Sequence, residues 1–121
     1  MQRILVAEDD PVLSMIYQIT LSEAGFDVML CADGQAAFEA LDSFAPDLVI
    51  TDHSMPRMSG GELVSAVRRR RPQAATLMAS GVNARLLKDD QHADARLEKP
   101  VTPGSLLQTV RALEALGCVS V

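Results

Sequence analysis

The chain has 121 residues, a net charge of −5 and 48% apolar side chains, which fits one folded domain with a buried core. No apolar stretch approaches the length of a membrane span, and the N-terminus lacks a secretory signal. The negative charge and the scarcity of aromatic side chains, of which there are four, disfavour direct nucleic-acid binding. Cys31 and Cys118 form no CxxC motif and are expected to be reduced thiols of a cytoplasmic protein.

Short apolar runs along the chain are expected to form strands. Most are continuous rather than alternating, as in a sheet that is covered on both faces. The expected strands are Ile4–Ala7, Asp27–Cys31, Leu48–Thr51, Thr76–Ala79 and Ala95–Leu97.

Helix signals follow each of these runs. Asp10 is placed to cap a first helix that begins at Pro11 and is closed by Gly25. Its apolar positions recur at helical spacing: Val12, Met15, Ile16 and Ile19. Asp33 is expected to cap a second helix, which ends before Pro46, and a third helix begins near Ser59 and buries Leu63 and Val67. A short helix is expected over Ala84–Lys88. The last expected helix runs from Thr102-Pro103 to Gly117 and buries Leu106, Val110 and Leu113.

Strand and helix alternate five times, which predicts an α/β fold with a parallel sheet and helices on both faces. In such sheets, ligands bind outside the carboxyl ends of the strands. Side chains from distant parts of the sequence are expected to meet at this edge: Glu8, Asp9, Asp52, Ser80 and Lys99.

The acidic members of this set indicate a cation site. Crowded carboxylates repel one another unless a cation joins them, and oxygen ligands with room for water and phosphate suit Mg²⁺. We interpret Asp9 and Asp52 as the metal-binding pair and Asp10 as a helix cap. Lys99 is expected to reach the pocket as a cation, and the Ser80 hydroxyl is placed to hydrogen-bond a phosphoryl oxygen.

Six segments together resemble the receiver domains of two-component response regulators, and they span essentially the whole chain in family order. They are Ile4-Leu-Val-Ala-Glu-Asp-Asp10, Asp33-Gly34, Pro46-Asp-Leu-Val-Ile-Thr-Asp52, Met55-Pro-Arg-Met-Ser-Gly60, Ser80-Gly81 and Lys99-Pro100. The stretch from Thr51 to Pro56 is most similar to receivers of hybrid sensor kinases. The resemblance implies a flavodoxin-like, doubly wound sheet of five parallel strands in the order 2-1-3-4-5.

The resemblance also implies roles for individual residues. Asp52 would accept a phosphoryl group from a phosphohistidine on a sensor histidine kinase or a histidine phosphotransfer protein. Asp9, Asp52 and the Ser54 carbonyl would ligate Mg²⁺, with Glu8 helping through water. Ser80 and Lys99 would contact the phosphoryl oxygens, and the Lys99-Pro100 bond is expected to be cis.

The chain departs from the family at positions that affect output. Arg96 replaces the usual aromatic switch residue, and an arginine is costly to bury without a partner. Ser80 and Lys99 are closer in sequence than is typical, so the polar run 88–92 is expected to be a short or poorly ordered part of the fourth helix region, with an altered output face. Val101 replaces a common phenylalanine.

We expect a stand-alone receiver over residues 1–121 with no output domain, acting as a switch rather than an enzyme. A receiver cut from a larger protein, and a pseudo-receiver that is not phosphorylated, are alternatives. A Mg²⁺-dependent aspartyl phosphatase fits less well, because Ser54 stands where that class needs a second aspartate. The run Arg68–Arg71 is interpreted as a helix C-terminus rather than a nucleic-acid site, and His53 as a loop residue turned away from the pocket.

Overall fold

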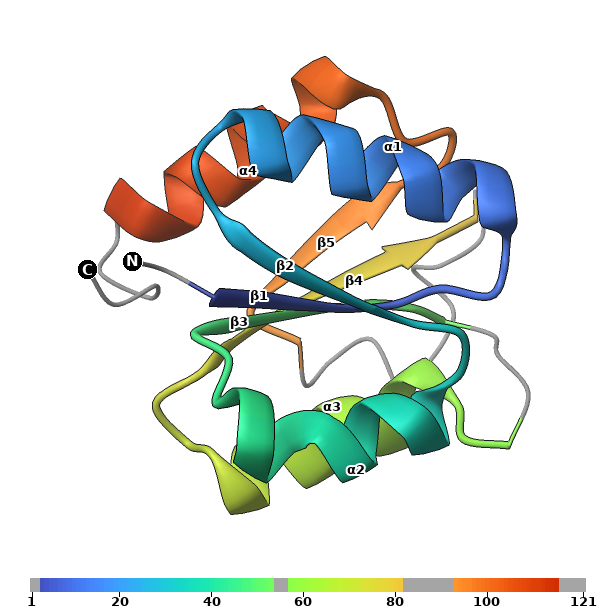
Figure 1. Ribbon diagram of the computed structural model, residues 1–121, viewed down its shortest axis with the longest axis vertical. Coiled ribbons are helices and arrows are strands. Elements are labelled where there is room, and N and C mark those ends of the chain that lie inside the picture. The colour runs from blue at the N-terminus through green and yellow to red at the C-terminus, as the bar shows by residue number, and fades with distance from the viewer. Residues whose placement is uncertain (1–2, 54–56, 82–92, 116–121) are drawn as a thin grey trace.

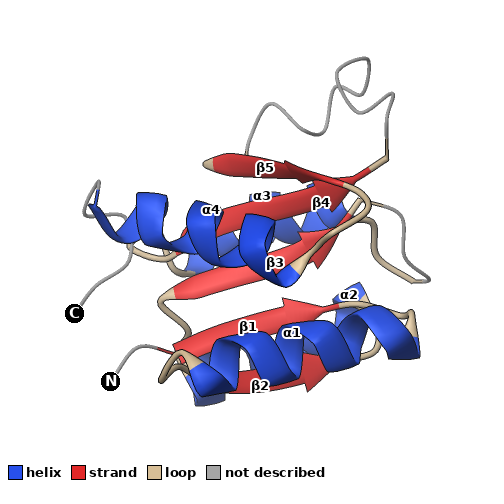
Figure 2. Ribbon diagram, turned by 90° about the horizontal axis from the view of Figure 1, so that it is seen from above, coloured by secondary structure: helices blue, strands red, loops and turns tan. Residues whose placement is uncertain are grey.

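A parallel sheet of five strands forms the centre of the computed structural model, with the strands hydrogen-bonded in the order β2-β1-β3-β4-β5 (Figure 2). The structure describes residues 3–53, 57–81 and 93–115. The strands are β1 (Arg3–Ala7), β2 (Asp27–Cys31), β3 (Leu48–Asp52), β4 (Ala75–Ser80) and β5 (Ala95–Glu98). The predicted strands and their order are therefore confirmed.

Helices cover both faces of this sheet, with α1 and α4 on one side and α2 and α3 on the other (Figure 1). They are α1 (Pro11–Glu23), α2 (Gly34–Phe44), α3 (Gly60–Arg70) and α4 (Pro103–Ala115). The expected helix over Ala84–Lys88 and the expected stop at Gly117 lie outside the described residues. No helix in the described ranges is long and apolar enough to cross a membrane.

The continuous apolar strands supply two cores, because successive side chains point to opposite faces of a strand. On β1, Ile4 and Val6 join the core under α1 and α4, whereas Leu5 and Ala7 join the core under α2 and α3. All four are fully buried. Burying one side chain the size of isoleucine or leucine contributes about 1.5–3 kcal/mol, so both helical layers are held by the same short strand.

Local capping explains where three of the helices begin. The Asp10 carboxylate accepts a hydrogen bond from the backbone N–H of Val12 at 2.9 Å. Asp33 accepts from Ala36 N–H at 2.8 Å, and Ser59 forms a reciprocal capping box with Glu62. Each such cap stabilises a helix by about 1 kcal/mol, and all three starts were predicted.

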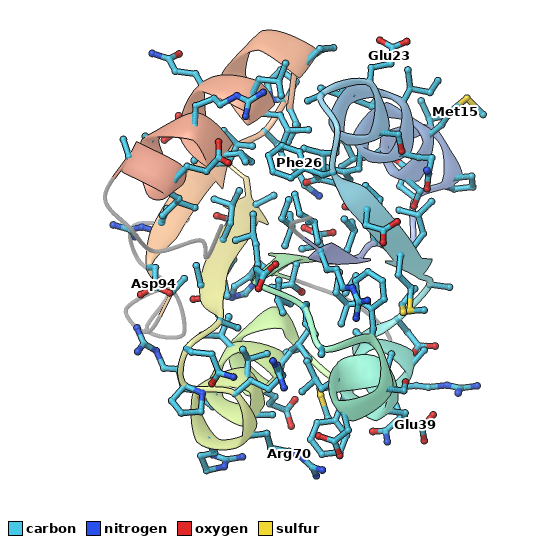
Figure 3. The ribbon with its side chains drawn as sticks, turned by 60° about the vertical axis from the view of Figure 1, so that its left-hand side comes forward. Met15, Glu23, Phe26, Glu39, Arg70 and Asp94 are labelled. Atoms are coloured by element: carbon cyan, nitrogen blue, oxygen red, sulfur yellow. The ribbon has the colours of Figure 1, made fainter. Side chains whose placement is uncertain are left out.

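The first helix presents its apolar stripe to solvent, which the amphipathic spacing did not anticipate. Val12, Met15 and Ile19 are 69%, 61% and 50% exposed, and Met15 points away from the sheet (Figure 3). The core is filled instead by Tyr17 and Leu21. This helix is apolar on more than one face, so sequence spacing alone could not decide which face is buried.

Asp94, the residue before β5, forms several hydrogen bonds at the amino-terminal end of the sheet. Asp94 Oδ2 accepts from the backbone N–H of Thr76 at 2.8 Å and from its hydroxyl at 3.1 Å, while Asp94 N–H donates back to that hydroxyl at 3.0 Å. Arg68 adds an ion pair to Asp94 Oδ1 at 3.2 Å. These contacts join α3, β4 and β5, and so fix the register of the edge strand.

The arginine run at the end of α3 makes contacts within the fold. Arg68 pairs with Asp94, and Arg70 pairs with Asp42 of α2. Arg70 also lies over the ring of Phe38, 5.3 Å from its centroid. These contacts favour the interpretation of the run as a helix C-terminus that ties α3 to its neighbours.

Candidate functional site

Three carboxylates converge at the carboxyl ends of β1 and β3. These strands are neighbours and pair in register up to Ala7 and Thr51, so the residues that follow emerge side by side. Oxygen atoms of Glu8, Asp9 and Asp52 all lie within 4.8 Å of one another. Glu8 and Asp52 are buried, with 2% and 7% of their surface exposed, whereas Asp9 faces solvent.

The carboxylate of Glu8 lies in an environment that disfavours its charged form. Its Oε2 accepts a hydrogen bond from the backbone N–H of Asp10 at 3.1 Å, but its buried Oε1 has no hydrogen-bond partner among the described residues. Burial raises the pKa of Glu8 to about 7; the hydrogen bond from Asp10 opposes the change, and the charge of Asp52 adds to it. A cation at the pocket would favour the ionised form.

Lys99 supplies a positive charge to the same pocket. Its Nζ lies 2.7 Å from Asp52 Oδ1, an oxygen that also accepts from the backbone N–H of His53 at 2.9 Å. Burial disfavours the charged ammonium, but the hydrogen bond and charge of Asp52, together with Glu8 and Asp9, outweigh burial and raise the pKa of Lys99. The Lys99-Pro100 bond is cis, as expected.

Ser80 ends β4 on the next strand along the edge. Asp52 pairs in register with Ala79, so Ser80 lies one residue beyond the level of the aspartate. It is buried, its carbonyl accepts from Lys99 N–H at 2.9 Å, and its hydroxyl has no hydrogen-bond partner in the described ranges. The hydroxyl is therefore available to a group that enters the pocket. Ser54, the fourth expected metal ligand, lies outside the described residues.

A glycine lets α3 begin directly against the acceptor strand. A Cβ at Gly60 would lie 2.2 Å from the backbone oxygen of Asp52, so any side chain there would displace β3 or the helix. Gly60 N–H also donates to the carbonyl of His53 at 2.9 Å. The sequence placed Gly60 in a motif, but the close approach became visible only in three dimensions.

The donor set fits a hard divalent cation such as Mg²⁺. All three side chains offer oxygen, the ligand atom that Mg²⁺ prefers, and one of them carries a buried oxygen without a partner. Asp9 opens the group to solvent, which leaves room for the water molecules that Mg²⁺ retains. Glu8, Asp9 and Asp52 are the residues that could hold such an ion.

Tyr17 of α1 belongs to the core under α1 and α4 and was not singled out by any motif. It is 1% exposed, and its hydroxyl has no hydrogen-bond partner among the described residues. Burial raises the pKa of this phenol, and the charges of Glu8 and Asp52 raise it further. The only sequence signal was a single tyrosine in a helix whose other large apolar residues are aliphatic or methionine.

An apolar groove runs from the pocket along α1. Its lining residues come from α1 and from the segment after β5: Asp10, Val12, Leu13, Ile16, Lys99, Pro100 and Val101. The exposed residues Met15 and Ile19 continue this apolar surface along the helix. A partner that reaches Asp52 from this side would meet apolar surface next to the Lys99 ammonium.

Comparisons with known proteins agree on one family. The profile described as response regulator receiver domain matches residues 4–111. The chain is 35% identical over 118 residues to the transcriptional regulatory protein TcrA of Mycobacterium tuberculosis, covering 95% of this chain and 47% of that protein. It is 33% identical over 113 residues to the DNA-binding response regulator MtrA of Mycolicibacterium smegmatis, covering 92% and 50%. The chain thus spans about half the length of these curated relatives.

Solved structures show the same architecture. The chemotaxis response regulator CheY4 of Vibrio cholerae superposes with a TM-score of 0.85 at 28% identity, covering 93% of this chain and 98% of that one. The response regulator protein TrrA of Thermotoga maritima, solved in complex with Mg(2+)-BeF, gives a TM-score of 0.85 at 28% identity and covers 93% and 99%.

Proposed function

The chain belongs to the response regulator receiver domain family, and on this premise we propose that it is a phosphoacceptor switch of a two-component or phosphorelay pathway. Asp52 accepts a phosphoryl group from a phosphohistidine, with Mg²⁺ bound by Asp9, Asp52 and the Ser54 carbonyl and assisted by Glu8 through water. The observation that carries this proposal is the convergence of three carboxylates with the Lys99 ammonium, which lies 2.7 Å from Asp52. The complex of TrrA with Mg(2+)-BeF supports the choice of metal.

The chemistry needs positioning and charge neutralisation rather than a further nucleophile. An Asp52 carboxylate oxygen attacks phosphorus, the bond between phosphorus and the histidine nitrogen breaks, and the nitrogen keeps the electron pair. A bound Mg²⁺ would neutralise charge on the carboxylates and the phosphoryl oxygens. Lys99 then pairs with a phosphoryl oxygen, and the unpartnered Ser80 hydroxyl donates to another.

The donor is a protein that docks along α1. The exposed residues Val12, Met15 and Ile19 give α1 an apolar stripe against which a sensor histidine kinase or a histidine phosphotransfer protein packs. The groove beside this stripe leads to Lys99. Continuity between the apolar surface and the acceptor pocket supports this side as the docking side. We place the reaction in the cytoplasm, where such kinases have access to ATP.

The test is to incubate the protein with Mg²⁺ and acetyl phosphate, and to measure its intact mass. We expect a gain of one phosphoryl group that disappears in Asp52→Ala and on chelation of the metal. Asp42→Asn is the matched control, because Asp42 pairs with Arg70 far from the pocket. No modification by any small donor or kinase would favour a pseudo-receiver, and sustained turnover of phosphoesters would favour a phosphatase.

The absence of an attached output domain stays a prediction. The size of the protein detected by immunoblot in its source cells tests it. The altered output face expected from the polar run 88–92 also stays a prediction, since that run lies outside the described ranges.

A further inference from the structure

The Tyr17 hydroxyl needs a physical explanation. The ring is packed into the core beneath α1 and α4, and the residue is 1% exposed. Its hydroxyl has no hydrogen-bond partner among the described residues. Burying a hydroxyl without a partner costs about 1–3 kcal/mol, and a phenylalanine would fill the same space without this cost.

Buried polar atoms without partners gather on one side of the molecule. Of the four such atoms in the described ranges, Glu8 Oε1 and Ser80 Oγ belong to the pocket, and Tyr17 Oη lies in the core under α1 and α4, where the charges of Glu8 and Asp52 add to burial in raising its pKa. The fourth, Arg71 Nε, follows α3. A donor on α1 and an acceptor of the pocket are thus both buried without a partner among the described residues.

The first turns of α1 pack against the end of β1, next to Glu8. The Ser14 hydroxyl donates to the Glu8 carbonyl at 3.2 Å, which fixes the start of the helix against the end of β1. Tyr17 is three residues further on and therefore lies on the same face of the helix, one turn deeper. Within the described structure, its O–H is a hydrogen-bond donor without a partner, and Glu8 Oε1 is an acceptor without a partner.

We propose that Tyr17 is a positioning residue of the metal pocket, whose hydroxyl donates a hydrogen bond toward Glu8 Oε1 through one water molecule and holds Glu8 for the cation. This inference rests on the proposed Mg²⁺ site. The outer partners of metal-binding carboxylates orient them, and losing one typically weakens metal affinity by about 10–100-fold. The buried phenol is then part of the site rather than a packing defect.

Tyr17→Phe tests this role, because it keeps the ring and removes only the hydroxyl. We expect the Mg²⁺ affinity measured by calorimetry to fall about tenfold. The effect should vanish in a Glu8→Gln background, because a double-mutant cycle reports coupling between the two side chains. Ser22→Ala is the control, since it removes an exposed α1 hydroxyl that contacts only Gln18 in the described structure.

The chain supplies its own probe for a second measurement. It has one tyrosine and no tryptophan, so its tyrosine fluorescence comes from Tyr17 alone. We expect Mg²⁺ to change this emission saturably in the native protein and to have no such effect in Glu8→Gln. This readout needs no Tyr17 variant, so it stands even if Tyr17→Phe fails to fold.

Two outcomes separate this inference from the function on which it rests. Equal Mg²⁺ affinities for the native protein and Tyr17→Phe, or an emission that does not move as the metal binds, would overturn the role of Tyr17 alone. A native protein that binds no Mg²⁺ would overturn the proposed function as well.

Discussion

Aspartates lie at both ends of the sheet, and their surroundings differ. At the amino end, Asp47 accepts from the backbone N–H of Arg3 at 2.9 Å, and Asp94 takes part in hydrogen bonds with Thr76 and an ion pair with Arg68. At the carboxyl end, Asp52 is buried beside Glu8 and within 4.8 Å of Asp9, with a single lysine for compensation.

The aspartates at the amino end of the sheet stabilise the fold, whereas those at the carboxyl end are arranged to bind a ligand. A carboxylate whose oxygens are paired with neighbouring donors stabilises the fold, and nothing further has to bind it. Carboxylates that face one another, next to buried polar atoms without partners, destabilise the protein when no ion is bound. Binding of a cation removes this destabilisation. Substitutions at the two ends should therefore change different properties.

The largest effect is expected when Lys99, at the carboxyl end of the sheet, is replaced. Lys99→Met removes the only positive charge within hydrogen-bonding distance of Asp52 in the described ranges, and should slow phosphorylation by acetyl phosphate about 100-fold, as for other lost charge-stabilising donors. The rate is followed by intact mass. Arg111→Met on the surface of α4 is the control, and an unchanged rate in Lys99→Met would show that the lysine has no part in the transfer.

At the amino end, Asp94→Ala should instead reduce stability. It leaves the buried N–H and hydroxyl of Thr76 without their carboxylate and removes the ion pair with Arg68. We expect a loss of about 2–3 kcal/mol in the free energy of unfolding, measured with urea. Asp9→Ala, which relieves repulsion, should leave stability unchanged or raise it. If the two variants lost equal stability, the distinction between the two ends would fail.

The pH dependence of stability should originate at the carboxyl end. The pKa of Glu8 is about 7 in the folded state against 4.5 for the unperturbed group. The folded state therefore holds this proton more tightly, so the stabilisation is complete below about pH 4.5 and is lost as the pH rises through 7. Without metal, we expect a loss of roughly 2 kcal/mol across this range.

Urea unfolding at several pH values measures this loss. Glu8→Gln should flatten the profile, and so should saturating Mg²⁺, whereas Asp47→Asn should leave the slope as it is. A slope that survives Glu8→Gln would place the responsible group elsewhere.

The smallest effect is expected on the exposed face of α1. Replacing Val12, Met15 and Ile19 with serine should slow transfer from a phosphorylated protein donor about tenfold, because apolar contact is lost at the docking surface. The rate with acetyl phosphate should not change, since a small donor needs no docking. Equal slowing with both donors would mean that the variant has damaged the pocket itself.

Local signals explain which features could be predicted from the sequence. Most strands are compact apolar runs, and the caps at Asp10, Asp33 and Ser59 act within three residues, so the elements and their order were accessible. The convergence of Glu8, Asp9 and Asp52 followed from strands that end at one edge.

The features that were missed depend on contacts between distant residues. Asp94 lies 18 residues from Thr76, and no local pattern links them. The buried face of α1 depends on how the helix packs against the sheet, because Val12 and Met15 are as apolar as the residues that it buries. The surroundings of Tyr17 depend on how α1 packs against the sheet, and so they could not be predicted from the sequence.

A crystal structure with Mg²⁺ and beryllofluoride tests the central claim most directly. We predict one ion bound jointly by the carboxylates of Asp9 and Asp52, beryllofluoride on Asp52, and Lys99 and Ser80 in contact with its fluorine atoms. Beryllofluoride absent from Asp52, or the two carboxylates bound to no common ion, would contradict the account.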